Sequence, residues 1–445
     1  MRLRIGQGAA PSLLALLCVA ACGSTSDPAP GRVDVQTITW YSNSSTEDNP
    51  IANLVETFER THPAIRVNAV PSPDSTDGKR TAIQEVIRNG INAPDVYLGD
   101  VIWPAEFSAE HLALPLDDVF GEQVWKRFPA ELVNAVTYGG RKYAVPFHSD
   151  QGLLYYRKDK VAPEKVPHTW EDLAGMAREL QTRPGFDYGF LWQGKQYEGL
   201  TCNWLEMVSA AGGQVLDDDG ARSRMTSPQS AVALRFMRQL ITEGVTPPDV
   251  TRFAEPDSTK LFASGAAPFM RGWNSAYTAI KNRLGPETDA QVGVAPLPAF
   301  AGQPYPGRST VGGWSLYINP NTKKLDAVKE LIDWLTDTPA QRIVARYSLI
   351  PTNRDVRSDS SIMNASPSLQ VVLEGTGANR PTLVTRPSNT PAYPDVSRGM
   401  YVNVHRALTG EATPEQALAD ADREINAILE RLPTASRPVL QSGFG

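Results

Sequence analysis

The segment Thr37-Ile-Thr-Trp-Tyr41 opens an alternation of strands and helices that decides the fold of this chain. It is an apolar, β-type run, and a polar turn and Pro50 follow it. Proline suits the first position of a helix, and the next apolar residues, Ile51, Leu54, Val55 and Phe58, share one helical face. The alternation continues with a strand at 65–67, a helix at 77–88 and a strand at 93–100. The order β-α-β-α-β predicts a parallel, doubly wound α/β sheet.

Polar residues follow two of these predicted strands. In doubly wound sheets, ligands bind beyond the carboxyl ends of the strands. Asn43 and Glu47 flank the first strand-to-helix turn, where one of them can bind a ligand while the other caps the helix. Asp100 ends the third strand, and its alternative role is to cap a helix that starts at Ile102. We therefore predict Asn43, Glu47 and Asp100 as site residues.

The remainder of the chain repeats the mixture of strands and helices. Two β-type runs, 141–147 and 152–156, flank the polar stretch His148-Ser-Asp-Gln151. A strand interrupted by glycines is predicted at 311–318. Helical periodicity predicts helices at 170–181, 200–211, 227–243, 323–336, 339–346 and 414–432.

The N-terminus is typical of an exported protein. Residues 13–22 form an apolar run after a basic start, and this run is too short to span a bilayer. Its last four residues, Val19-Ala-Ala-Cys22, resemble a bacterial lipobox, in which cleavage precedes the cysteine and the cysteine carries the lipid. We expect a signal peptide at 1–21, lipidation of Cys22, and a location on the extracytoplasmic face of the cell membrane. The alternative is an ordinary signal peptide cut nearby. The polar, Pro-rich segment 22–32 is expected to be a flexible tether.

Composition excludes several classes of function. The net charge is −6 and the basic residues form no stripe, so we expect no nucleic-acid partner. The five histidines lack zinc-ligand spacing, and we expect neither a metal nor a cofactor. Once the signal peptide is removed and Cys22 is lipidated, Cys202 is alone, so no intrachain disulfide can form. The roughly 410 residues beyond the tether are enough for two domains.

Several segments, taken in order, resemble the extracellular sugar-binding proteins of bacterial ABC importers, of the maltose/trehalose-binding type. They read "ITWY", "LVETFERTHPAIRV", "APDVYLGD", "YAVPF", "GLLYYRKD", "TWEDL", "LFASGAAPFM", "VGVAPLP", "GGWSLYI" and "AVKELIDWL". The resemblance implies a periplasmic-binding-protein-like fold, with two α/β lobes joined by a hinge around a central ligand cleft. It also implies an N-terminal lobe of 33–147 plus 313–365 and a C-terminal lobe of 148–312 plus 366–445.

The same resemblance implies several ligand-binding residues. The aspartate that ends the strand containing "DVYLGD", Asp100, grips sugar hydroxyls in this family. Asp150 contacts the ligand where the chain crosses between the lobes, and its alternative is a turn residue. Trp273 and Trp314 line the cleft, and core packing is the alternative for both. Arg386, in "TRPSNTPAY", lies against the sugar, and its alternative is a salt bridge that anchors the loop.

Three further residues suit the chemistry of a sugar, which offers hydroxyl edges and C–H faces. Gly313 precedes Trp314 and lets the backbone approach a ligand closely. Glu198 and Asn203 lie near Trp192 and Tyr197, so polar groups and rings occur together. For Glu198 and Asn203 the alternatives are a surface loop and a helix start.

Within the family, the lipobox and the segment "WQGKQYEGLTC" look like those of the mycobacterial trehalose-recycling lipoproteins. The resemblance implies a non-catalytic, monomeric receptor that is held at the membrane by a lipid anchor. It would capture a disaccharide, trehalose, and deliver it to the importer's permease subunits. Two alternatives stay open: a receptor of the same fold for another α-glucoside or related polyol, and a secreted glycosidase that uses two cleft carboxylates.

Overall fold

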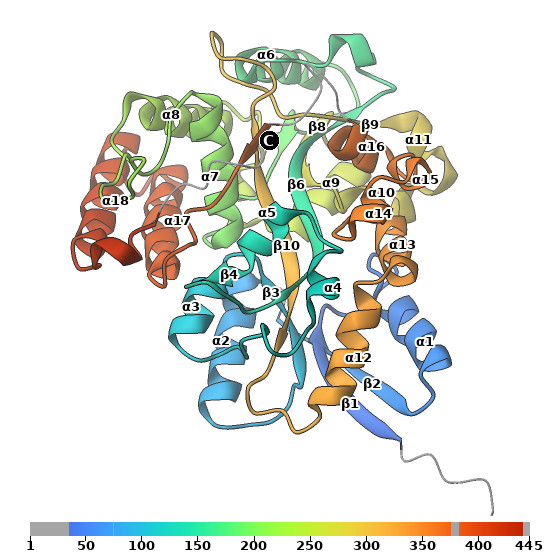
Figure 1. Cartoon of the computed structure of the whole chain (residues 1–445). Helices are drawn as coiled ribbons and strands as arrows, with labels where there is room; N and C mark the ends of the chain where they lie inside the picture. The colour runs from blue at the N-terminus through green and yellow to red at the C-terminus, as the bar shows by residue number, and fades with distance from the viewer. Residues whose placement is uncertain (1–34, 74, 375–381, 439–445) are drawn as a thin grey trace, which may run out of the picture.

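Two long strands, β6 (Val145–Arg157) and β10 (Arg308–Ile318), run side by side through the middle of the molecule (Figure 1). This computed structural model describes residues 35–73, 75–374 and 382–438. The predicted signal peptide, the lipidation site Cys22 and the tether lie outside the described residues. The two strands pair antiparallel, and the sheet order β2-β1-β3-β10-β6-β8-β7 places them at its centre.

The part of the sheet formed by the first three strands of the chain confirms the predicted parallel α/β alternation. Strand β1 (Gln36–Ser42) pairs in parallel with β2 (Ile65–Pro71) and with β3 (Val96–Asp100). The connecting helices are α1 (Ile51–Thr61) and α2 (Thr76–Arg88), which both have a polar and an apolar face. The chain later returns to this part of the sheet through β10, and α12 (Leu325–Leu335) and α13 (Thr338–Arg346) follow.

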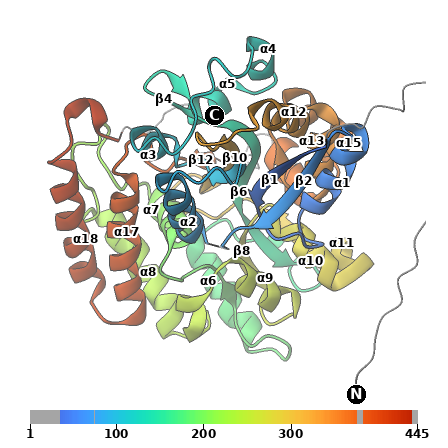
Figure 2. The same ribbon diagram turned by 90° about the horizontal axis from the view of Figure 1, so that it is seen from below.

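The other end of the sheet is richer in helices. It contains β7 (Phe190–Leu191), β8 (Phe269–Trp273) and β9 (Val292–Ala295). The larger helices are α6 (Trp170–Gln181), α7 (Glu198–Ala210), α8 (Pro228–Thr242), α9 (Glu255–Ala263), α10 (Ala276–Leu284), α17 (Tyr393–Thr409) and α18 (Pro414–Leu429). Helices α17 and α18 lie at the side of the molecule away from α1, as Figures 1 and 2 both show.

Short elements complete the described part of the chain. Three pair with other strands: β11 (Ile350–Pro351) with β6, β12 (Thr382–Val384) with β10, and β4 (Thr137–Tyr138) with β5 (Arg141–Lys142). The short helices are α3 (Pro104–Ala109), α4 (Glu122–Trp125), α5 (Ala130–Ala135), α11 (Thr288–Gln291), α14 (Arg354–Arg357), α15 (Ser360–Met363) and α16 (Pro367–Glu374).

Separate hydrophobic cores lie on either side of β6 and β10, which are here called the crossing strands. The first core contains Trp40 and Phe58 and extends to Val328. The second core is centred on Trp170 and Trp204, and a smaller one around β8 contains Tyr155 and Met270. Strand β6 contributes Val145 and Phe147 to the first core and Leu154 and Tyr156 to the second. The assignment of 33–147 plus 313–365 and 148–312 plus 366–445 to two lobes stays a prediction.

The structure extends or adds elements that the sequence did not predict. Residues 148–151, expected as a polar stretch between two β-type runs, continue a single strand, β6. Pairing on both sides explains this, because β10 and β11 both contact β6 there. The 17-residue helix α17 was not predicted, because its sequence carries prolines near its start and polar residues throughout.

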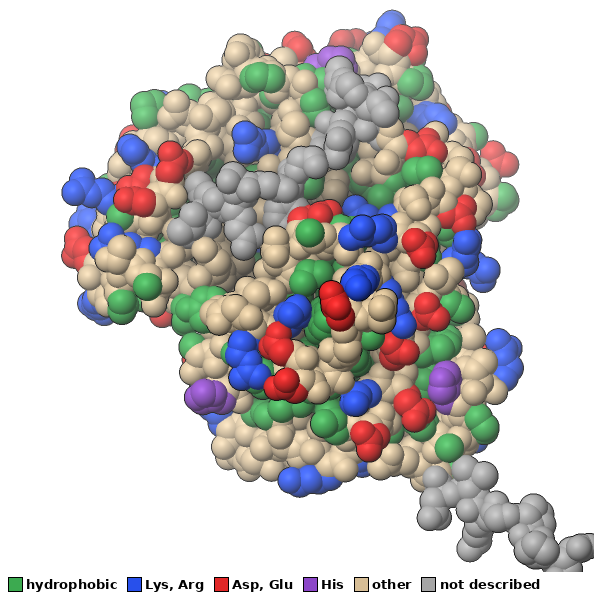
Figure 3. Space-filling view, viewed as in Figure 1, with side chains coloured by type: hydrophobic (Ala, Val, Ile, Leu, Met, Phe, Trp, Pro, Cys, Tyr) green, Lys and Arg blue, Asp and Glu red, His purple; other side chains and the backbone are tan. Residues whose placement is uncertain are grey.

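The described residues contain no helix long and apolar enough to cross a membrane, and no group of His, Cys, Asp and Glu that could hold a metal ion. Cys202 is buried with a free thiol. On the face shown in Figure 3, basic and acidic side chains are interspersed, so this face has no patch of a single sign.

Replacing Gly313 by alanine should destabilise the protein, because Gly313 has a φ of +140° and an added Cβ would lie 2.6 Å from the carbonyl oxygen of His148. We expect the free energy of unfolding, measured with urea, to fall by about 1–3 kcal/mol. Gly175→Ala is the matched control, since a Cβ there meets no atom within 4 Å and Gly175 lies inside helix α6. The control should leave stability unchanged or raise it slightly. An equal effect of both changes would show that the crossing strands impose no special constraint on Gly313.

Candidate functional site

A cavity of about 230 Å³, here called the inner compartment, lies between the elements of the two main cores. Side chains from α2 and β3 line one side of it, those from α7, α9 and β8 line the other, and the crossing strands contribute the rest. It brings together most of the predicted site residues, namely Asn43, Asp100, Asp150, Glu198, Trp273, Gly313, Trp314 and Arg386. Segments that are far apart in the sequence therefore converge on one polar cavity.

A larger cavity of about 680 Å³, the outer compartment, adjoins the inner one. Both are lined by Asn43, Lys79, Tyr197, Glu255 and Trp273. The outer compartment adds a mixture of charged, polar and apolar side chains, including Asp48, His148, Gln193, Lys195, Asp257 and Arg283. The two compartments together form one cleft that is large enough for more than one sugar ring.

The register of the strands explains which side chains form the floor of the cleft. Alternate residues of a strand face the same side, so His148, Asp150 and Gly152 share one face of β6. Trp314 lies opposite His148, and Gly312 lies opposite Asp150. An added Cβ at Gly312 would lie 3.1 Å from the Trp273 ring and 3.3 Å from Asp150 Cβ, so the glycine leaves room for both side chains.

Arg386 joins two carboxylates that belong to opposite sides of the cleft. Its Nη2 donates to Asp100 Oδ1 at 2.7 Å, and its Nη1 donates to Asp100 Oδ2 at 3.3 Å and to Glu198 Oε1 at 3.1 Å. All three side chains are buried, with 8 % exposure or less. The arginine therefore offsets the charge of two buried acids, and it makes the salt bridges that its sequence context offered as an alternative role.

Glu198 is the first residue of helix α7 and has a crowded polar environment. Tyr393 donates its hydroxyl to Oε1 at 2.6 Å, and Ser397 donates to Oε2 at 2.5 Å. Burial raises the pKa of Glu198 to about 7, although Arg386 and the two hydroxyl groups act in the opposite direction. Its backbone N–H donates to Asp77 at 3.2 Å, which adds a direct contact between α7 and α2.

Both predicted tryptophans are only partly buried, and each has a cation over its ring. The Arg271 guanidinium lies 4.1 Å from the Trp273 ring centroid and is fixed by two hydrogen bonds, of 2.8 and 2.6 Å, to buried Glu206. Trp273 Nε1 donates to Glu255 at 3.2 Å, which also fixes the ring edge. Lys79 Nζ lies 4.0 Å from the Trp314 ring centroid. Both rings are therefore held in place at the wall of the cleft.

Among the residues that line the inner compartment, two buried polar atoms have no hydrogen-bond partner in the described part of the chain. They are Asp150 Oδ1 and Arg386 Nε. Buried polar atoms in proteins are almost always paired, so each of these atoms indicates a missing partner such as a ligand or water. The carboxylate can accept a hydrogen bond, and the guanidinium N–H can donate one.

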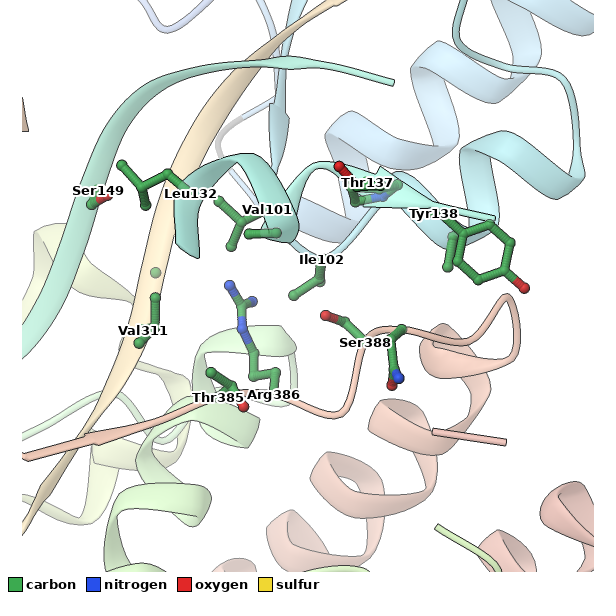
Figure 4. A pocket seen from close by; sticks show the side chains of 15 residues that line it. Val101, Ile102, Leu132, Thr137, Tyr138, Ser149, Val311, Thr385, Arg386 and Ser388 are labelled. Atoms are coloured by element: carbon green, nitrogen blue, oxygen red, sulfur yellow. The ribbon is translucent and has the colours of Figure 1, made fainter. Parts of the chain in front are cut away.

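A second cavity, of about 50 Å³, lies behind Arg386, and Figure 4 shows its lining. Val101, Ile102, Leu132 and Val311 make most of it apolar, and the Arg386 side chain extends into it. Arg386 and Gly312 line both this cavity and the inner compartment. Ser149 faces this rear cavity, on the side of β6 opposite Asp150.

Two predicted residues do not line the inner compartment. The main-chain carbonyl of Glu47 accepts a hydrogen bond from Asn282 at 3.0 Å, and its side chain is exposed. Asn203 is buried within α7, where its amide donates to Gly199 O at 2.9 Å. Asn203 lies inside α7, five residues after the helix begins at Glu198, and its role as a ligand contact stays a prediction. Asp100 Oδ1 also accepts from the Ile102 N–H at 3.3 Å, but the next helix, α3, begins only at Pro104, so Asp100 does not cap it.

Sequence reasoning missed several residues that line the cleft: Lys79, His148, Gln193 and Glu255. Glu255 is the first residue of α9, where an acidic side chain is favourable for reasons unrelated to ligands. Lys79 lies within the amphipathic helix α2, where a single lysine is not a signal of a site. His148 belongs to the polar stretch between the two predicted β-type runs and was not predicted as a site residue. The alternation along β6 could have placed it on the same face as Asp150.

Residues 42–342 match the model of the bacterial extracellular solute-binding protein family, and the chain belongs to this family. A probable ABC transporter-binding protein of Deinococcus radiodurans is 32 % identical over 378 residues, which cover 82 % of this chain and 87 % of that protein. The maltotriose-binding protein of Pyrococcus abyssi is 23 % identical over 350 residues, covering 78 % and 70 % of the two chains.

Solved structures agree with this family. The maltose-bound MalE3 of T. maritima superposes with a TM-score of 0.80 at 34 % identity, over 88 % of this chain and all of that one. The GacH receptor of Streptomyces glaucescens, solved without ligand and with acarbose, gives a TM-score of 0.75 at 22 % identity, over 90 % of this chain and all of that one. The fold is thus periplasmic-binding-protein-like, as predicted, and these relatives are binding proteins.

Changing Glu198 to glutamine should alter how stability depends on pH. A carboxylate whose pKa is raised on folding contributes stability that is complete below its unfolded pKa and is lost as pH rises through its folded pKa of about 7. Between pH 4.5 and 8, the free energy of unfolding of the wild type should fall relative to that of Glu198→Gln, by on the order of 2–3 kcal/mol. Guanidinium unfolding at several pH values measures this difference.

The same change at Glu122, which is exposed on helix α4, is the control and should leave the pH profile unaltered. A wild-type stability that rises relative to Glu198→Gln over this range would show that Glu198 is held as an anion in the folded protein.

Proposed function

We propose that this protein is the lipid-anchored solute-binding protein of an ABC importer, and that it captures a disaccharide, trehalose, and delivers it to the permease. One observation carries the proposal. Carboxylates, an arginine and two indole rings converge on one buried compartment, where Asp150 Oδ1 and Arg386 Nε have no partner among the described residues. A sugar hydroxyl can donate a hydrogen bond to Asp150 Oδ1 and accept one from the Nε–H of Arg386.

The chemistry of the cleft suits a carbohydrate in two further respects. Indole rings offer apolar faces to the C–H faces of a pyranose, and Trp273 and Trp314 remain partly exposed at the cleft wall. Charged groups of the inner compartment are already engaged with one another, because Arg386 contacts both Asp100 and Glu198. A neutral, hydroxyl-rich molecule can hydrogen-bond to such groups without adding a buried charge.

The relatives support a sugar as the ligand. MalE3, at 34 % identity, is described as bound to maltose, and the Pyrococcus abyssi relative is described as maltotriose-binding. The Deinococcus radiodurans relative is described as a probable ABC transporter-binding protein, which supports an importer as the partner.

Trehalose is proposed from the sequence likeness to the mycobacterial trehalose-recycling lipoproteins and from the shape of the cleft. Trehalose joins two glucose rings through both anomeric carbons, so it is bent and has no reducing end. The adjoining inner and outer compartments offer polar partners to both rings. Maltose bends differently and presents a free anomeric hydroxyl, which would leave polar groups of such a site without partners.

The alternatives use the same cleft differently. Structures of this fold with ribitol and with D-mannitol are 22 % and 19 % identical to this chain and show a shared fold only. A glycosidase would need one carboxyl group as acid and a second as nucleophile or base. Here a single arginine contacts both Asp100 and Glu198, so neither is available without breaking a buried ion pair.

The protein from residue 33 onward should bind trehalose and be stabilised by it, with a much smaller effect of maltose or sucrose. Isothermal titration and thermal unfolding with each sugar measure this preference. Equal shifts with maltose and trehalose would reduce the proposal to a general α-glucoside receptor. Release of glucose in excess over protein during a long incubation would instead indicate a glycosidase.

The Asp150→Ala variant tests whether trehalose binds at the inner compartment. Losing a charge-assisted hydrogen bond should weaken trehalose binding by about tenfold to over a hundredfold, because such a bond contributes about 1.5–3 kcal/mol. The ligand-free melting temperature should change little, since Asp150 Oδ1 has no partner among the described residues.

Cys22→Ala should abolish membrane anchoring if Cys22 carries the lipid. Metabolic labelling with a palmitate analogue and fractionation of the host cells would report the modification and the location. Cys18→Ala is the matched control, because Cys18 lies four residues upstream within the same apolar run and should leave anchoring intact. Equal labelling of the wild type and Cys22→Ala would contradict the lipobox interpretation.

A further inference from the structure

His148 lines the outer compartment and has no predicted role, whereas Asp150, two residues along β6, lines the inner one. Because both residues share one face of the strand, a ligand that fills both compartments can contact both side chains. The side chains are almost completely buried, with 5 % and 9 % exposure.

The two side chains contact each other without forming a complete hydrogen bond. His148 Nδ1 lies 3.2 Å from Asp150 Oδ2, yet Nδ1 has no partner of good hydrogen-bond geometry among the described residues. Asp150 Oδ1 likewise lacks one. Two neighbouring buried residues thus retain hydrogen-bonding capacity, which is unusual in a folded protein.

The backbone prevents this pair from relaxing. Strand β6 is paired on both sides at this point, with Trp314 of β10 and Pro351 of β11 both opposite His148. The His148 ring also packs edge-on against Phe147, with ring centroids 5.4 Å apart. The two side chains are therefore held in place before a ligand arrives.

The carboxylate also determines which ring nitrogen of His148 can accept a hydrogen bond. A bare Nδ1 lone pair would face a carboxylate oxygen 3.2 Å away, so of the two imidazole tautomers the geometry favours the one with its hydrogen on Nδ1. Its Nε2 is then an acceptor. The pair therefore offers two acceptors, Nε2 of His148 and Oδ1 of Asp150.

We propose that His148 is a specificity-determining ligand contact, which accepts a hydroxyl of the ring in the outer compartment through Nε2 while Asp150 accepts a hydroxyl of the ring in the inner compartment. This inference rests on the proposed sugar-binding function and adds the position of the ligand across β6. The ligand class it selects is a molecule with hydroxyl donors on two linked rings.

Titration calorimetry of trehalose against four variants tests the proposal. His148→Leu should weaken binding about threefold to tenfold, the loss of one neutral hydrogen bond. His148→Gln places an amide oxygen near the position of Nε2 and should restore most of the affinity, whereas the shorter side chain in His148→Asn should not. Ser149→Ala is the matched control, because Ser149 faces the rear cavity, and it should bind like the wild type.

The pattern of the variants separates the possible outcomes. Wild-type affinity in His148→Leu, or equal losses in His148→Gln and His148→Leu, would overturn the acceptor role while leaving the receptor function intact. If His148→Leu does not fold, the comparison of His148→Gln with His148→Asn decides the same question. If neither trehalose, maltose nor ribitol stabilises the wild-type protein, the proposed function itself fails, and this inference fails with it.

Discussion

The antiparallel pairing of β6 with β10 is the constraint on which the other features depend. Strand β6 contributes to both main cores, and β10 contributes to the first and contacts α7 beside the second, so the pair fixes the position of one set of helices relative to the other. They also supply the floor of the cleft, where Asp150, Gly312 and Trp314 share a face because of the strand register. Gly313, with its φ of +140° and its close approach to His148, lets the strands stay this close.

Arg386 adds an electrostatic constraint to this framework. Burying Asp100 and Glu198 alone would be costly, and the arginine offsets that cost by contacting both. Buried ion pairs contribute little net stability compared with apolar packing, so stability alone does not account for charged groups at this place. Because Asp100 ends β3 and Glu198 begins α7, the ion pairs connect the two sides of the cleft. A ligand that competes for these groups would alter that connection.

Much of the fold could be predicted from local patterns. The alternation of β1, α1, β2, α2 and β3 follows from hydrophobic periodicity and turn residues, which are short-range properties. Helix α6 also begins and ends where its periodicity predicted. The polar stretch 148–151, expected between two β-type runs, is instead part of one strand, because pairing with β10 and β11, which are more than 150 residues away, keeps it extended. Helix α17 was missed because packing against α7 and α18 stabilises it more than its own sequence does.

The sequence by itself determined the kinds of residue available to a site: carboxylates at strand ends, tryptophans after glycines, and an arginine in a proline-rich segment. Only the tertiary structure decided which of them meet. Asn203 and Glu198 are five residues apart, yet Asn203 bonds within its own helix while Glu198 faces Arg386. Lys79 joins the cleft although no local pattern marks it, and His148 joins it because the extended strand β6 puts it on the same face as Asp150. The physical reason is that periodicity specifies which face of an element is buried, whereas long-range packing determines which other element that face meets.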